Sequence, residues 1–124
     1  GGLMQFGNDI FDIYKDRISN IQTILTTAKK IEIVRQLFTN QMNKSFALTE
    51  QLSYKAKDKK KYLSLVTMSL CSRCFVCLDQ LKMNEKATNF VFMPEKYTRE
   101  QLVCDMDKGN NKLKTIKYFL GQSI

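Results

Sequence analysis

The sequence predicts an all-α fold: a helical bundle built on long antiparallel helices, with a small C-terminal helical subunit and a short extended segment near residues 89–94. Residues 8–93 contain no glycine and no proline, the residues that most often break regular structure. Apolar residues recur at steps of three and four along most of this stretch, which is the spacing of one helix face. Long helices with an apolar face must pack on one another, which predicts a bundle.

The first predicted helical region begins at Asn8, a residue type favoured at the N-cap, and Asp9 follows in the first turn, where a carboxylate interacts favourably with the helix dipole. Its apolar stripe runs from Ile10 to Leu52. One long helix, or two helices joined near residues 39–46, would produce this stripe. A helix of about 40 residues would be about 60 Å long. We therefore expect part of the stripe to stay uncovered, available to a partner chain or to a second copy.

A second helix is predicted over residues 59–83, where the apolar face is wider. Its polar side is narrow and includes Ser69, Ser72 and Arg73, so this helix should lie between other elements rather than at the edge of the bundle. The expected inner stripe consists of Leu63, Val66, Leu70, Cys74, Cys77 and Leu81.

The character of the sequence changes after Ala87. Residues 89–94 are aromatic and β-branched and end at a proline, which predicts an extended segment or a short edge strand. Thr98 and Gln101 match a capping box, so a helix is predicted over residues 99–107, ending at Lys108-Gly109. A last helix is predicted over residues 111–120, with Leu113, Ile116, Tyr118, Phe119 and Leu120 on its apolar side.

The totals favour a single domain, 1–124, with a long helical part at about 8–85 and a C-terminal part at about 88–124. The chain begins with Gly1-Gly2 rather than Met, so we expect it to be a fragment of a larger protein. No apolar run reaches the roughly 18–20 residues of a membrane span, so no transmembrane segment is expected. The absence of a signal-peptide pattern and the clustering of three of the four cysteines favour an intracellular location, cytoplasmic or nuclear.

Four cysteines, Cys71, Cys74, Cys77 and Cys104, allow three interpretations. Together they are enough for a tetrahedral zinc or an iron–sulfur cluster. Cys71 and Cys74 also have the spacing of a redox dithiol, although such pairs favour a helix N-terminus and this one lies in mid-helix. The favoured interpretation is that the thiols fill the core, because buried free cysteines behave as small hydrophobic residues. We expect no cofactor, with zinc as the alternative.

A lysine cluster carries half of the net charge of +8: its five lysines, set against Asp58, contribute +4. Such a cluster is able to bind phosphates without sequence preference, although a charge run is more often a solvated turn. The cluster consists of Lys55, Lys57, Lys59, Lys60 and Lys61.

The sequence argues against a self-contained enzyme. It has no histidine, which removes the commonest general base and every Ser-His-Asp or Cys-His nucleophile. Its glycines form neither a Walker A loop nor a G-x-G-x-x-G motif. We therefore expect a non-enzymatic domain for protein–protein interaction or assembly, with a protein partner or self-association. The alternatives are a basic nucleic-acid-binding module that uses Lys55–Lys61, with or without a cysteine-bound zinc, and a metal-cluster or redox protein.

Overall fold

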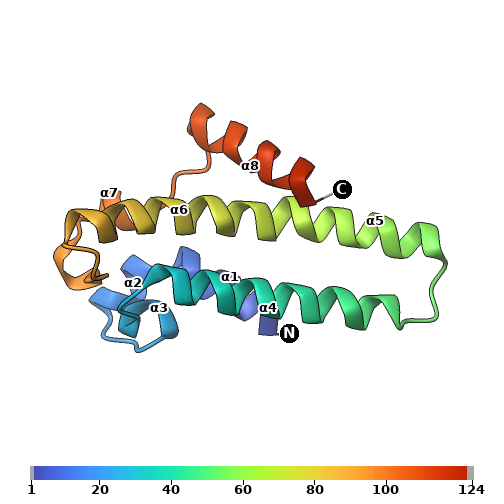
Figure 1. Ribbon diagram of the computed structural model, residues 1–124, viewed down its shortest axis with the longest axis horizontal. Helices are drawn as coiled ribbons and strands as arrows, with labels where there is room; N and C mark the ends of the chain where they lie inside the picture. The colour runs from blue at the N-terminus through green and yellow to red at the C-terminus, as the bar shows by residue number, and fades with distance from the viewer. Residues whose placement is uncertain (1, 123–124) are drawn as a thin grey trace.

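The computed structural model describes residues 2–122 and is all-α: helices and short helical turns account for its regular structure, and these residues contain no strand. A long helical hairpin forms the frame, short N-terminal helices pack on one side of it, and the C-terminal helix packs on another (Figure 1). The elements are α1 (Gly2–Phe11), α2 (Ile13–Ile18), α3 (Ile24–Thr27), α4 (Ile31–Glu50), α5 (Ala56–Val66), η1 (Thr67–Cys71), α6 (Ser72–Ala87), η2 (Pro94–Lys96), α7 (Arg99–Leu102) and α8 (Gly109–Gln122).

The predicted all-α fold is confirmed, and its frame is a helical hairpin (Figure 1). Its first arm is α4, and its second arm is the continuous helix Ala56–Ala87, formed by α5, η1 and α6 (Figure 1). The second arm is unequally packed along its length: α5 contributes no buried residue, whereas α6 is buried on most sides. The difference arises because α1 and α8 pack on the α6 half of the hairpin and leave the α5 end projecting (Figure 1).

The prediction of one long N-terminal helix, or of two helices, is wrong. The chain forms α1 to α4 instead, and α4 runs unbroken through residues 39–46, where the two-helix alternative placed its joint. The breaks lie at polar residues: Asn20 has a φ of 58°, and Thr23 caps α3 through a reciprocal pair of hydrogen bonds with Thr26. Asparagine tolerates this left-handed conformation, and threonine hydroxyls compete with helical bonding, so both favour ends of helices.

The predicted N-cap at Asn8 is also wrong, because α1 begins at Gly2 and Asn8 lies inside it. Gly7 does not end a helix; it lies inside α1, where it is buried against the hairpin. A Cβ built at Gly7 would lie 2.5 Å from Leu70 Cδ1 and 3.4 Å from Cys74 Sγ. The missing side chain lets α1 approach the hairpin closely at the cost of some helix propensity.

The second arm is longer than the predicted 59–83 helix, and only the second half of its predicted inner stripe is fully buried. A single π-helical turn, η1, interrupts the α-helical pattern at Thr67–Cys71, and such a turn changes the register of the side chains that follow. Leu63 and Val66 before this turn and Leu70 within it are only half-buried, whereas Cys74, Cys77 and Leu81 after it are buried as predicted. Ser72, expected on the polar side, is fully buried.

A residue of another helix caps the N-terminus of α4. The N-cap residue Lys30 makes no side-chain capping bond, and Glu85 of α6 supplies the acceptor instead: its Oε1 accepts from the Ile31 N–H at 2.7 Å. Glu85 is buried, so its carboxylate sits in the core beside the positive end of the α4 dipole. This bond ties the start of one hairpin arm to the end of the other.

The C-terminal part differs from its prediction in two places. Residues 89–94 form no strand; Asn89 and Phe90 have φ values of 56° and 62°, and Pro94 opens the 3₁₀ turn η2. The Thr98–Gln101 capping box is confirmed, but its helix α7 ends at Leu102 rather than residue 107. Gln80 explains the early end in part, because its side-chain amide donates to the backbone oxygens of Gln101 and Val103.

Gly109 does not end a helix but begins α8, which covers the predicted 111–120 helix and extends it at both ends. Within the described residues, the continuous helix Ala56–Ala87 is long and apolar enough, by length and composition alone, to cross a membrane. In this fold 47% of its most apolar window is buried, and core helices of soluble proteins pass the same test.

Candidate functional site

The four cysteines all lie in the core, as expected of thiols that fill space. Cys71 ends η1, Cys74 and Cys77 belong to α6, and Cys104 follows α7; all four are free and buried. No group of three or more His, Cys, Asp or Glu side chains in the part of the chain described is arranged to hold a metal ion. The geometry therefore gives the zinc and cluster alternatives no support.

Two of the thiols differ electrostatically from the others. Burial raises the pKa of Cys71 to about 11 and raises the pKa of Cys74 further. Cys77 donates its thiol proton to the Ile10 backbone oxygen at 3.8 Å, and its interaction with the neighbouring Cys104 raises the pKa of Cys77 and lowers that of Cys104; Lys114 and Lys108 also favour the Cys104 thiolate. Cys104 lines a surface hollow with Arg73 and Arg99, so it is the thiol most ready to react.

The predicted lysine cluster lies at the tip of the hairpin, which we define as residues 49–64. The start of α5 carries the five lysines, and four of them, Lys55, Lys57, Lys60 and Lys61, are exposed. Lys59 has a structural role: its Nζ donates to the Glu50 backbone oxygen at 2.8 Å and caps the end of α4. Among the described residues, the other four make no ion pair or side-chain hydrogen bond.

Beside these lysines, the tip has a hollow of about 410 Å³ that the prediction did not include. Tyr54 and Tyr62 both line it, together with Leu52, Thr49, Asp58 and Lys59. The two rings are 69% and 55% exposed. A second hollow, lined by Lys55, Lys57, Asp58, Lys60, Lys61 and Ser64, adjoins it through Asp58. The only signal in the sequence was that two tyrosines flank the lysine run.

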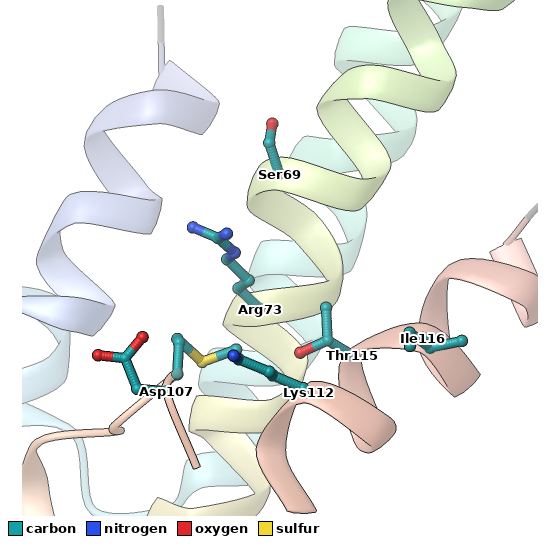
Figure 2. Close-up of a pocket in the computed structure, with 7 residues that line it drawn as sticks. Ser69, Arg73, Asp107, Lys112, Thr115 and Ile116 are labelled. Carbon is teal, nitrogen blue, oxygen red and sulfur yellow. The ribbon is translucent and has the colours of Figure 1, made fainter. Parts of the chain in front are cut away.

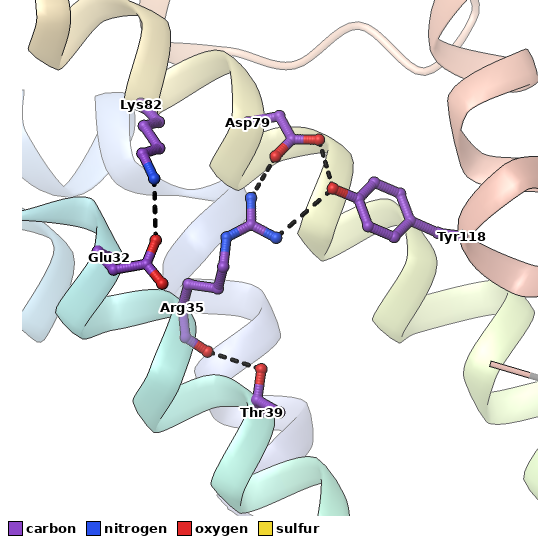
Figure 3. Close-up of polar contacts among 6 residues, drawn as sticks. All are labelled: Glu32, Arg35, Thr39, Asp79, Lys82 and Tyr118. Carbon is purple, nitrogen blue, oxygen red and sulfur yellow. Dashed lines mark hydrogen bonds and ion pairs between the residues drawn. The ribbon is translucent and has the colours of Figure 1, made fainter. Parts of the chain in front are cut away.

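A polar cluster fixes α8 to the hairpin (Figure 3). Asp79 pairs with Arg35 of α4 and accepts a hydrogen bond from the Tyr118 hydroxyl of α8 at 2.6 Å. The Tyr118 ring stacks on Phe75, with centroids 5.3 Å apart, and Phe75 in turn meets Phe38 edge to face. The hydrogen bond that Arg35 donates to the Tyr118 hydroxyl and the charge of Asp79 outweigh the effect of burial and raise the pKa of Arg35.

The outward side of α8 is apolar. Thr115 is buried and Tyr118 half-buried on the side that packs on α6, whereas Leu113, Ile116 and Leu120 are 61%, 44% and 57% exposed. These three residues, which we call the outer face of α8, were predicted to lie on the apolar side of the helix, but they do not join the core. Helical spacing of i, i+3 and i+7 places them in one line.

A groove of about 490 Å³ runs beside the outer face of α8 (Figure 2). Ser69 and Arg73 of the long helix line one wall, and Thr115 and Ile116 line the other. Met106, Asp107 and Lys112 complete it. Ile116 therefore belongs both to the groove and to the outer face.

Comparison with known proteins found no matching family, no matching characterised protein and no similar solved structure.

Proposed function

We propose that this chain is a helical protein–protein interaction module that binds an acidic amphipathic helix of another protein on the outer face of α8. The single observation that carries the proposal is the orientation of α8. It packs through Thr115 and Tyr118 and leaves a line of leucine and isoleucine in solvent. A surface helix of a globular protein normally turns its apolar stripe to the core, so the exposed stripe supports a role in binding.

The geometry of the stripe favours a helical partner. Leu113, Ile116 and Leu120 present about two turns of apolar surface, the spacing with which one helix recognises the groove or face of another. Beside Ile116 the surface continues into the groove lined by Arg73. A guanidinium there is free to form a bidentate contact with a carboxylate.

The charges around the stripe favour an acidic partner. At 100° per residue, Lys112 and Lys117 lie on either side of it, and both are exposed. In a symmetric pair of this chain, the same lysines would face each other, and each copy carries a net charge of +8. A partner helix with leucine in its stripe and glutamate at its flanks would avoid both the repulsion between facing lysines and the repulsion between two positively charged chains.

The test uses a designed peptide of about three heptads, with leucine at a and d and glutamate at the flanking positions. A second peptide has lysine in place of each glutamate. Titration into ¹⁵N-labelled protein should shift the amide resonances of α8 with the acidic peptide and leave them unchanged with the basic one. The double variant L113Q/L120Q should lose this binding, because it removes apolar surface without touching the core.

The matched control is L48Q/M83Q, which removes two equally exposed apolar side chains from α4 and α6 and should bind like the wild type. Binding of both peptides alike, or equal loss in the control variant, would contradict the proposal. A stable dimer of the chain alone in light scattering, abolished by L113Q/L120Q, would assign the outer face to self-association instead.

A further inference from the structure

We propose that the tip of the hairpin is a binding site for single-stranded nucleic acid, in which Tyr54 and Tyr62 stack on bases and the neighbouring lysines contact phosphates. This site is separate from α8, so it does not depend on the function proposed above. It is assigned from three properties of the tip: its hollow, its unpaired charges and its lack of a role in the core.

The hollow has the size and lining that a base requires. Its volume of about 410 Å³ is ample for one planar ring system, and two exposed tyrosines line it. Stacking on aromatic rings is the main sequence-independent contact that proteins make with unpaired bases. Thr49, Asp58 and Lys59 line the same hollow and offer donors and acceptors to the polar edges of a base.

The lysines lie where a phosphate backbone would leave that hollow. Lys55, Lys57, Lys60 and Lys61 line the adjoining hollow, and Asp58 lies between the two. Because none of these four is paired within the described residues, their charge is available to an anion. The cluster also holds half of the net charge of the chain.

Folding alone does not explain this concentration of charge. The N-cap of α5 is Lys55, which makes no side-chain capping bond, and Lys57 follows in the first turn. Cations there are opposed by the positive end of the helix dipole. No residue of α5 is buried, so the core gains nothing in return. A bound polyanion would relieve the repulsion.

Single-stranded nucleic acid fits these properties better than a duplex or a membrane. In a duplex the bases are stacked on one another and cannot enter a hollow, so only the phosphate contacts would remain. An anionic membrane would use the lysines equally well, but lipid headgroups offer no planar ring to stack on Tyr54 and Tyr62.

The experiment measures fluorescence anisotropy of labelled oligo-dT and oligo-rU of about 15 nucleotides, the matching duplex, and vesicles that contain phosphatidylserine. With four lysines on phosphates, the slope of log K against log salt should be about −2.8, so affinity should fall about 50-fold between about 50 mM and about 200 mM NaCl. Single strands should bind more tightly than the duplex.

Variants separate stacking from charge. Y54A and Y62A should each weaken binding at least about fivefold and leave the salt slope unchanged, while Y62F should bind like the wild type. K57Q/K60Q should reduce the slope by about 1.4. K86Q/K96Q, an equal loss of charge at the other end of the hairpin, should leave the slope unchanged. Circular dichroism checks that each variant is folded.

Three results would overturn the assignment. The first is no binding of either single strand at the lower salt concentration. The second is binding that is equal for duplex and single strand and insensitive to Y54A and Y62A, which would be electrostatic attraction alone. The third is vesicle binding that K57Q/K60Q abolishes, together with no binding of oligonucleotides, which would assign the tip to a membrane surface.

Discussion

Replacing Tyr118 with phenylalanine tests whether the cluster around Asp79 is what holds α8 in place. The substitution removes the hydroxyl that donates to Asp79 at 2.6 Å and keeps the ring that stacks on Phe75. A hydrogen bond to a charged group contributes about 1.5–3 kcal/mol. The Asp79 side chain is 37% exposed and stays paired with Arg35, and water partly replaces the lost donor. We therefore expect Y118F to weaken the attachment of α8 by an amount near the lower end of this range, about 1.5 kcal/mol.

Hydrogen exchange is the sharpest measurement because α8 is a terminal helix that can open without global unfolding. A loss of about 1.4 kcal/mol corresponds to about tenfold faster exchange of the α8 amides. The control is Y14F, since the Tyr14 hydroxyl makes no hydrogen bond within the described residues; it should change exchange less than twofold. A change below twofold in Y118F, or an equal change in every helix, would refute the role given to Asp79.

The same bond predicts a pH dependence. Burial, together with the hydrogen bond to Asp79, raises the pKa of Tyr118 above its ordinary value of 10.0. The contribution of this hydrogen bond to stability is therefore complete below pH 10 and is lost as the pH rises through the higher pKa that Tyr118 has in the folded state. Exchange of the α8 amides should accelerate over that alkaline range in the wild type relative to Y118F.

Three further substitutions or reagents test other parts of the fold. E85A should destabilise the protein by about 1–3 kcal/mol in urea denaturation, because it leaves the buried Ile31 N–H without its acceptor; an unchanged midpoint would contradict the capping role. S72A should stabilise by about 1 kcal/mol, since the buried Ser72 hydroxyl has no hydrogen-bond partner among the described residues and alanine favours the helix; a lower midpoint would reveal a partner. Iodoacetamide at pH about 8 should alkylate Cys104 first, by mass spectrometry, because its pKa is lowered while the pKa values of the other thiols are raised; equal rates would argue against the interaction with Cys77.

Local signals in the sequence predicted part of the fold well. The glycine-free stretch indicated long helices, and Thr98 with Gln101 marked the start of α7, because capping depends on residues close together in the chain. The breaks before α4 were missed because the apolar steps of three and four continue across Asn20 and Thr23. The cap that Glu85 gives α4 comes from a residue distant in sequence, so no local pattern contains it.

In the candidate sites too, features that depend on neighbouring residues were visible in the sequence, and features that depend on distant residues were not. The lysines of the tip form a run and were visible in the sequence, but the hollow depends on the turn, which brings Tyr54 in the loop and Tyr62 in α5 to line the same space. The exposure of Leu113 and Leu120 was not visible either. Their spacing is that of a core-facing stripe, and only the bonds of Tyr118 show that another side of α8 faces the hairpin.

The unequal packing of the hairpin makes the tip a good place to test function. Around α6, many substitutions change a side chain that the fold buries, so loss of binding and loss of folding are hard to separate. At the tip no residue of α5 is buried. Exposed substitutions away from the Lys59 cap should change stability by no more than about 0.5 kcal/mol. A binding defect in Y54A or K57Q/K60Q therefore reports on the ligand, and the same reasoning holds for the exposed leucines of α8.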